Sequence, residues 1–157
     1  MYLRKVISGG QTGADEAGLE AAYMYGFETG GHAPKYYRTS AGPNLVLKDR
    51  YGLVQDSSES YPPRTLKNVQ NSDATIRLAK NFKSKGEVLT LKYISKEAKP
   101  HFDVDILSPP DPRELALWIH RNKFEIINIA GNTETDGSIY EFVYHYLKQV
   151  FKILEKL

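Results

Sequence analysis

Short runs typical of strands alternate with stretches of helical spacing along almost the whole chain. Apolar residues that recur every three or four positions predict helices over 14–24, 89–99, 115–124 and 137–157, and one more that ends at Ser72-Asp73. The expected strands cover residues 5–7, 26–32, 74–78, 101–107 and 125–131. Strands that alternate with helices in this way predict a three-layer α/β fold, in which a parallel sheet has right-handed crossovers and helices on both faces.

Composition narrows the class of protein further. The chain of 157 residues suits one domain over 1–157, large enough to bury a core without cross-links. A formal charge of +2 with scattered lysines gives no basic surface, so we expect neither nucleic acid nor a membrane as partner. The absence of cysteine excludes disulfides and the usual structural zinc sites, and we expect no metal site. Without an apolar signal segment or eighteen successive apolar residues, the expected location is cytoplasmic.

A glycine-rich turn between the first strand and the first helix is the strongest local motif. In Ser8-Gly9-Gly10-Gln11-Thr12-Gly13-Ala14-Asp15, three glycines allow positive φ and bring backbone amides close to a ligand. Free amides and the dipole at a helix N-terminus favour an anion. The pattern predicts a phosphate cradle, or else a turn that only lets helix and strand pack closely. Its spacing fits neither the P-loop nor G-x-G-x-x-G.

A second polar segment precedes the strand at 74–78. Arg64 and Asn68 are four residues apart, so on a helix they share one face and could both contact a phosphate or a polar head group. The alternative is structural, with Arg64 in a salt bridge and Ser72-Asp73 forming a turn.

A third polar segment lies at the end of the last expected strand. Asn128 is the polar exception in the apolar run 125–131, and Gly131 ends that run. These residues suit either a ligand site or a simple strand-end turn. Because ligands of open α/β sheets lie outside the carboxyl ends of the strands, we expect the three segments to converge there.

The same three segments, in this order, resemble the molybdenum cofactor carrier family. They are Ser8–Asp15, Arg64–Asp73 with its Arg-Thr, Asn-Val and Ser-Asp pairs, and Asn128–Glu134 followed by Gly137–Tyr140. This family is a branch of the Rossmann-like group that also includes the cytokinin-activating phosphoribohydrolases and the DNA-processing protein A family. The resemblance covers nearly the whole chain. It implies a Rossmann-like fold and a carrier that binds molybdenum cofactor (molybdopterin), a pterin bearing a phosphate.

This resemblance also implies a set of ligand-binding residues. Amides of the glycine turn, with Thr12, would hold the phosphate, and Asn128, Asp73 and Glu134 would contact the ring system. The full expected set is Gly9, Gly10, Gln11, Thr12, Gly13, Asp15, Arg64, Thr65, Asn68, Ser72, Asp73, Gly86, Thr90, Asn128, Gly131 and Glu134.

The chain departs from the family pattern at two places. Glu87 stands where the family has a small hydroxyl residue in a glycine-threonine turn that opens a helix. A carboxylate there would repel an anion, so either this second anion subsite is lost or Glu87 points away from it. Asn132-Thr133 replaces a Pro-Arg pair, which removes a cation, so contact with an anionic head group is either weaker here or passes to Arg64 or Lys35.

The leading hypothesis is a binding protein, not an enzyme, whose small anionic ligand is molybdenum cofactor or an unidentified nucleotide-like anion. The rival is a nucleotide sensor or nucleotide-processing enzyme, in which Asp15 and Glu134 could act as acid and base if they approach each other. The Pro-Gly-Gly-x-Gly-Thr turn of the phosphoribohydrolases is missing, which favours the carrier. A scaffold that keeps only the fold is the third alternative.

Three other features give further expectations. His32, at the end of a strand near the crevice, is a secondary ligand candidate. The irregular segment 35–63 is either a lid over the crevice or a surface excursion. The helix at 137–157 has a wider apolar stripe than one sheet face needs, which predicts a homo-oligomer, either a dimer or a tetramer.

Overall fold

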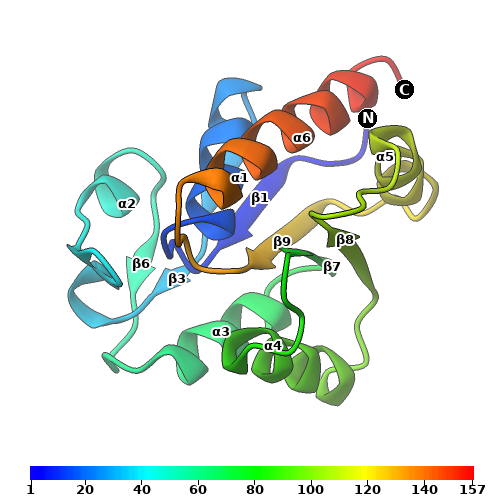
Figure 1. Cartoon of the computed structure of the whole chain (residues 1–157). Helices are drawn as coiled ribbons and strands as arrows, with labels where there is room; N and C mark the ends of the chain where they lie inside the picture. The colour runs from blue at the N-terminus through cyan, green and yellow to red at the C-terminus, as the bar shows by residue number, and fades with distance from the viewer.

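A five-stranded parallel sheet runs through the centre of the computed structural model, which describes residues 1–157 (Figure 1). The strand order is β2-β1-β9-β7-β8, and every neighbouring pair is parallel. The strands are β1 Lys5–Ser8, β2 Glu28–Gly30, β7 Ala74–Ala79, β8 His101–Asp105 and β9 Ile126–Gly131. The α/β, Rossmann-like class expected from the sequence is therefore confirmed.

Helices cover both faces of this sheet (Figure 1). One face carries α1 Ala14–Met24, α5 Pro112–Arg121 and α6 Ser138–Leu154, and the other carries α3 Tyr61–Gln70 and α4 Lys85–Lys96. The apolar spacing placed the start of α4 four residues too late, because polar residues form its first turn. That turn begins where Ser84 accepts a hydrogen bond from the amide of Glu87 at 3.4 Å.

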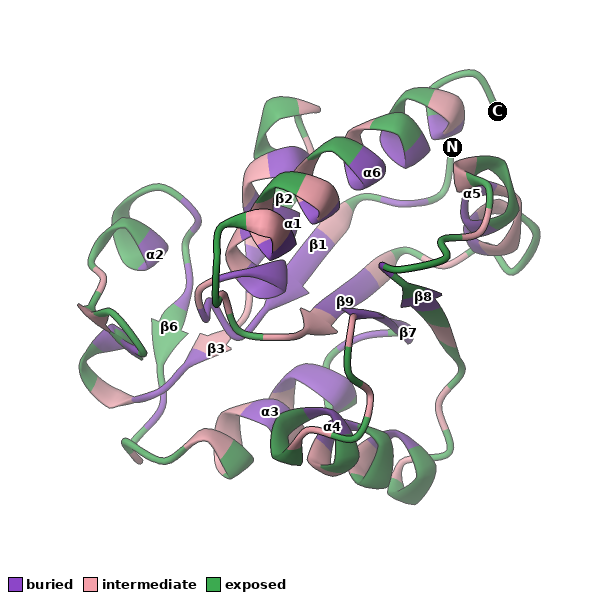
Figure 2. Cartoon of the chain, in the orientation of Figure 1, coloured by how far each residue is buried: buried purple, intermediate pink, exposed green.

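The two faces of the sheet differ in polarity. Alternate residues of β7 and β9, among them Ile76, Leu78, Ile127 and Ile129, belong to one apolar core with α1, α5 and α6. Figure 2 shows the buried side of α1 and of α6 turned toward the sheet. The residues between them on the strands face α3 and α4 instead and include polar side chains, among them Asn128. The sheet therefore offers polar groups on one side, beneath α3 and α4.

A smaller lobe connects β2 to α3 (Figure 1). It contains short elements around a second core made by Leu19, Ala33, Tyr37, Leu47, Tyr51 and Leu53. Its elements are β3 His32–Ala33, the 3-10 helix η1 Lys35–Tyr37, β4 Arg38–Thr39, β5 Gly42–Pro43, α2 Val46–Asp49 and β6 Val54–Gln55. The segment is thus folded rather than irregular.

The expected strand at 26–32 is divided in two. Gly31 separates β2 from β3 with φ at 123°, and a Cβ there would lie 2.2 Å from the carbonyl oxygen of Ser8. This close approach requires glycine and turns the chain out of the main sheet. No helix of the chain has the length and apolar character needed to cross a membrane.

Candidate functional site

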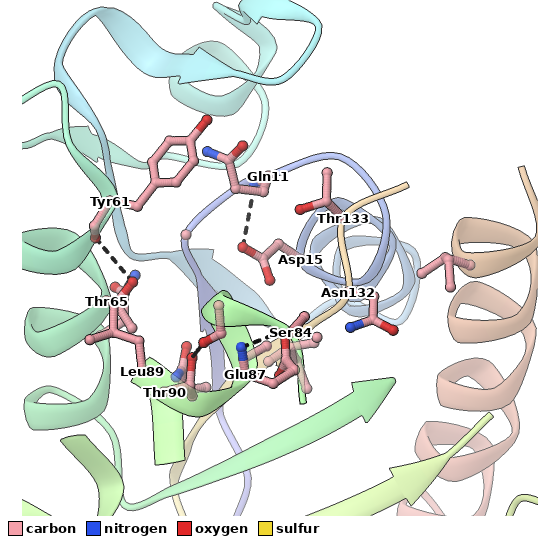
Figure 3. A pocket seen from close by; sticks show the side chains of 18 of the residues that line it. Gln11, Asp15, Tyr61, Thr65, Ser84, Glu87, Leu89, Thr90, Asn132 and Thr133 are labelled. Carbon is pink, nitrogen blue, oxygen red and sulfur yellow. Dashed lines mark hydrogen bonds between the residues drawn. The ribbon is translucent and has the colours of Figure 1, made fainter. Parts of the chain in front are cut away.

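A cavity of about 440 Å³ opens at the carboxyl ends of β1, β9 and β7. Its size falls within the range of small-molecule sites. Figure 3 shows its side chains converging from α1, α3, α4 and the loop after β9. The lining residues are Gly9, Gln11, Asp15, Tyr61, Arg64, Thr65, Asn68, Lys80, Asn81, Ser84, Gly86, Glu87, Leu89, Thr90, Asn128, Ile129, Ala130, Gly131, Asn132, Thr133, Thr135 and Ile139.

The glycine turn is held by its own side chains. The amide of Gly10 donates to Ser8 Oγ at 3.2 Å, and the amide of Gln11 donates to Asp15 Oδ2 at 3.2 Å. The Gln11–Asp15 bond is visible in Figure 3. A carboxylate of the chain therefore already accepts a hydrogen bond from one of the amides that the sequence pattern predicted would bind a phosphate.

Arg64 lies directly against the turn. A Cβ on Gly9 would be 1.7 Å from Arg64 Nη1, so only glycine leaves room for this guanidinium. Arg64 Nη1 is 3.4 Å from Asp15 Oδ2, and the Asp15 side chain is only 6% exposed. Burial raises the pKa of Asp15 to about 6, although the Arg64 charge and the Gln11 amide oppose the rise. Arg64 is therefore both the salt-bridge partner that the alternative interpretation proposed and a cation of the cavity.

Glu87 is a second buried carboxyl group in the cavity. It is 2% exposed, and neither carboxylate oxygen receives a hydrogen bond from the protein. Arg77 donates to the backbone oxygen of Glu87 at 3.2 Å, while its other nitrogens bond Asp103. Burial raises the pKa of Glu87 to about 7, helped by the negative charge of Asp15. The Glu87 side chain therefore does not point away from the cavity, and it places an acidic group at the N-terminus of α4.

Three buried polar atoms of the cavity have no partner within the protein. They are Gln11 Oε1, Arg64 Nε and Glu87 Oε1. Buried polar groups in folded proteins nearly always find a hydrogen-bond partner, and leaving one without costs about 1–3 kcal/mol. A ligand that supplies one acceptor and several donors would satisfy all three.

Ten of the sixteen residues expected at the site line this cavity. Some of these side chains are already hydrogen-bonded within the protein. Asn68 accepts from the His32 amide at 2.9 Å and donates to the His32 carbonyl at 3.0 Å, so it mainly holds β3 in place. Asn128 donates to Thr75 Oγ1 at 3.2 Å. The ten are Gly9, Gln11, Asp15, Arg64, Thr65, Asn68, Gly86, Thr90, Asn128 and Gly131.

Three residues of the glycine turn face other parts of the protein. A Cβ on Gly10 would meet Leu47 at 2.7 Å, and one on Gly13 would meet the carbonyl oxygen of Asn132 at 2.6 Å. Thr12 Oγ1 lies 2.8 Å from Ser40 Oγ of the small lobe. These glycines therefore serve close packing, so the tight-packing alternative holds for Gly10 and Gly13.

Ser72 and Asp73 lie away from the cavity. Asp73 Oδ2 accepts hydrogen bonds from the amides of Glu125 at 2.8 Å and Ile126 at 2.9 Å. These amides begin β9, so Asp73 lies at the amino end of the sheet, opposite the cavity. Ser72 Oγ donates to the carbonyl oxygen of Asn68 at 2.9 Å. The expectation that this pair reaches the ligand edge is wrong for this reason.

Glu134 caps α6 rather than facing the cavity. Its carboxylate accepts hydrogen bonds from the amides of Gly137 at 3.0 Å, Ile139 at 3.3 Å and Tyr140 at 2.7 Å. The acid and base pair proposed for Asp15 and Glu134 is therefore not formed. The carboxyl group that shares the cavity with Asp15 is Glu87.

The small lobe does not close over the cavity. Of the segment 35–63 only Tyr61, at the start of α3, lines it. Gln11 Nε2 fixes the lobe to the turn by donating to the carbonyl oxygen of Arg38 at 3.0 Å. Lys35 is absent from the lining as well. His32 instead borders a second cavity of about 180 Å³. The secondary ligand candidate thus lies outside the main site.

Several lining residues were missed by reasoning from the sequence. The most informative are Lys80 and Asn81, which follow β7 directly and could have been found from the rule that ligands lie beyond strand ends. Asn132 Oδ1 accepts from the amides of both, at 2.8 Å and 3.0 Å, and so ties the ends of β7 and β9 together. Lys80 also brings a positive charge to the lining, and its ammonium group donates to Ser138 Oγ.

Comparison with known proteins gives a family model and solved structures that match this chain. The model of the circularly permutated YpsA SLOG family matches residues 6–151. Among solved structures, that of a "putative molybdenum carrier protein" from Syntrophus aciditrophicus SB is 30% identical, with a TM-score of 0.84 over 96% of this chain and 95% of that chain. None of the curated proteins matches. The family match includes the three motifs and every residue that lines the cavity.

Proposed function

Since this chain belongs to the circularly permutated YpsA SLOG family, we propose that it is a binding protein for a phosphate-bearing pterin or nucleotide-like ligand. The solved relative named as a molybdenum carrier makes molybdenum cofactor the first candidate for that ligand. The ligand binds in the cavity at the carboxyl ends of β1, β9 and β7. The protein holds and protects this molecule rather than converting it.

One observation carries the proposal. Gln11 Oε1, Arg64 Nε and Glu87 Oε1 are buried without a partner, and all three residues line the same cavity. In a cavity open to solvent such groups bind water or a ligand, and a polar heterocycle with matching donors and acceptors can replace that water. Tyr61 and Leu89, which also line the cavity, supply surface for a planar ring.

The phosphate position follows from the cations of the lining. Arg64 and Lys80 are the two basic side chains of the cavity, and a planar guanidinium suits a phosphate well. The amide of Gln11 already donates to Asp15, and Gly10 and Gly13 lie outside the lining. We therefore place the phosphate at Arg64, whose guanidinium lies against Gly9, and Lys80 adds a second charge.

The first experiment asks what the protein holds and whether Arg64 is needed. Protein purified from its host is analysed for molybdenum and for the fluorescence of oxidised pterin, and a phosphate-bearing pterin is then titrated in a thermal-shift assay. We expect the purified protein to retain pterin and its melting temperature to rise when the ligand is added. Arg64→Gln should reduce the affinity for the ligand at least tenfold and so give a smaller rise. Arg121→Gln, an exposed change on α5, is the control and should bind normally. Absence of pterin and of any shift with phosphate-bearing ligands would refute the proposal.

One feature favours a second candidate, a nucleotide-processing enzyme. Asp15 and Glu87 share the cavity, and their pKa values are raised to about 6 and about 7, which suits acid and base work near neutral pH. Release of free base from nucleoside monophosphates would support this candidate if Glu87→Gln abolishes it and Glu134→Gln does not. Inactivity across a panel of nucleotides would exclude the enzyme and leave binding as the only proposed function.

A further inference from the structure

We propose that Glu87 makes the cavity selective for a ring with a 2-amino-4-oxopyrimidine edge, the edge that pterin and guanine share. This inference rests on the proposed function and names the part of the ligand that the protein reads. Family resemblance does not suggest it, because Glu87 stands where the related pattern has a small hydroxyl residue.

The Glu87 side chain receives no hydrogen bond from its own protein. Its side chain is 2% exposed, Oε1 is buried, and no side chain or amide donates to either oxygen. The nearby Arg77 is committed elsewhere, since its Nη2 and Nε bond the carboxylate of Asp103 and its Nη1 bonds only the backbone oxygen of Glu87. An ionised carboxylate in such a place is costly unless a partner from outside supplies donors.

A partner for this carboxylate must offer hydrogen-bond donors. A carboxylate accepts two parallel hydrogen bonds best from two adjacent N–H groups. A 2-amino-4-oxopyrimidine presents a ring N–H beside an amino group, which matches this demand. An adenine-type ring presents an acceptor nitrogen beside its amino group, so one carboxylate oxygen would face a lone pair. The edge is therefore selected by its pattern of donors.

The rest of the lining agrees with a ligand of mixed polarity. Gln11 Oε1 is a further buried acceptor without a partner, while Arg64 and Lys80 provide positive charge for a phosphate. Figure 3 shows Gln11 and Asp15 on one side of the cavity and Glu87 on the other, with Asn132 and Thr133 beside them. A ring whose donor edge faces Glu87 can extend its phosphate away from this carboxylate, which lowers the repulsion between them.

The test compares ligands that differ only at this edge. GMP, IMP and AMP share the phosphate and the ribose, and IMP lacks only the 2-amino group of GMP. Isothermal titration should rank their affinities GMP, then IMP, then AMP, with GMP about tenfold to a hundredfold above AMP. A phosphate-bearing pterin is the fourth ligand. Tighter binding of the pterin than of GMP would identify a pterin as the ligand that carries this edge. Tighter binding of GMP would identify a guanine nucleotide.

Variants connect this preference to Glu87. Glu87→Gln should reduce the difference between GMP and AMP to less than about threefold and leave AMP affinity nearly unchanged. Glu87→Asp withdraws the carboxylate by one methylene and should also weaken the preference, which gives a second variant if the first fails to fold. Glu141→Gln, an exposed change on α6, is the control and should keep the ranking.

Two outcomes would overturn the inference in different ways. Equal binding of GMP, IMP and AMP by the wild-type protein, or a preference that survives Glu87→Gln, would refute the role of Glu87 and leave the proposed binding function intact. No binding of any of the four ligands to the wild-type protein would refute the proposed function, and the inference with it.

Discussion

At the scale of single residues, the cavity gathers charges that oppose one another. Asp15 and Glu87 raise each other's energy as anions. Arg64 forms an ion pair with Asp15 at 3.4 Å and, together with Arg77, offsets only part of the rise in the pKa of Glu87. Such an arrangement disfavours the ligand-free protein and is typical of binding and catalytic sites rather than of stable cores. The cost should appear in the pH dependence of stability.

The first prediction concerns Glu87 and pH. Its pKa is raised from 4.5 to about 7 in the folded protein, so the folded state holds this proton more tightly than the unfolded state does. The favourable contribution is complete below about pH 4.5 and is lost as the pH rises through 7. Glu87→Gln should therefore stabilise the ligand-free protein by about 1–3 kcal/mol at pH 8 and by much less at pH 5.

Urea unfolding of both proteins at several pH values measures this difference. Four other charged groups act on Glu87, namely Asp15, Arg77, Asp103 and Arg64. Asp15 has a pKa of about 6 and interacts with Glu87, so the difference between the two proteins measures Glu87 together with its coupling to Asp15. A difference that does not change between pH 5 and pH 8 would contradict the raised pKa.

At the scale of elements, the ends of helices and strands position the site. The turn after β9 is shaped by Glu134, whose carboxylate accepts from four amides at the start of α6, those of Thr135, Gly137, Ile139 and Tyr140. Although burial alone would raise it, these amides hold the pKa of Glu134 below its usual value. The cap therefore fixes the loop that carries Asn132 and Thr133 into the cavity.

Loss of this cap gives the second prediction. Glu134→Ala should lower the free energy of unfolding by about 1–2 kcal/mol at pH 7, because the first amides of α6 lose their acceptor. Because the folded pKa of Glu134 is depressed, its contribution exists above the usual glutamate pKa and fades as the pH falls through the folded value. Thermal unfolding at pH 7 and pH 3 measures both effects. Equal stability of variant and wild type at pH 7 would rule out the cap.

The third prediction compares two glycines at strand and helix ends. A Cβ on Gly131 would lie 2.0 Å from the carbonyl oxygen of Leu78, its partner across the β7–β9 ladder, whereas nothing lies within 4 Å of a Cβ on Gly86. Gly131→Ala should cost about 3 kcal/mol or more, since backbone must move. Gly86→Ala, in α4, should be neutral or stabilise by up to about 1 kcal/mol. Chemical denaturation of both variants would contradict this if their stabilities were equal.

These elements explain how much of the molecule the sequence could predict. The strand, turn and helix from Lys5 to Met24 were predicted correctly because local spacing and glycine content determine them. The roles of Asp73 and Glu134 could not be predicted, because a carboxylate beside a strand end can face a ligand or a backbone amide equally well. Asp73 contacts amides 52 and 53 residues away in the chain, which no local pattern reveals.

The same limit applies to the site itself. Arg64 and Asn128 were expected in the cavity from their position at strand and helix ends, and they line it. Glu87 was recognised as a departure from the family pattern, but its burial beside Asp15 depends on how α4 crosses the sheet. Lys80 carried a usable signal, its place directly after β7, whereas Thr135 and Ile139 carried none.

At the scale of the whole molecule, the apolar stripe of α6 finds most of its partners within the chain. Seven of its residues, from Ile139 to Leu154, are buried, and the helix packs against α1 and α5. The wide apolar stripe that suggested a homo-oligomer is therefore buried largely within the protomer. The oligomer stays a prediction, now better assigned to exposed apolar residues such as Tyr23 and Met24 on α1.

Light scattering at micromolar concentration tests that fourth prediction. A particle of twice or four times the 17.8 kDa chain mass is expected, and Met24→Lys should shift it toward the monomer if α1 forms the contact. Lys152→Glu, an exposed change on α6, serves as the control and should leave the particle mass unchanged. A wild-type protein that remains monomeric would contradict the expectation.

The central claim is that the cavity beyond β1, β9 and β7 binds a phosphate-bearing heterocycle. Nuclear magnetic resonance of the labelled protein, titrated with GMP and with a phosphate-bearing pterin, tests it most directly. We predict amide shifts concentrated at Gly9, Gln11, Thr65, Gly86 and Asn132, with little change around the second cavity near His32. Saturating ligand that shifts none of these five amides, or that shifts only those near His32, would contradict the account.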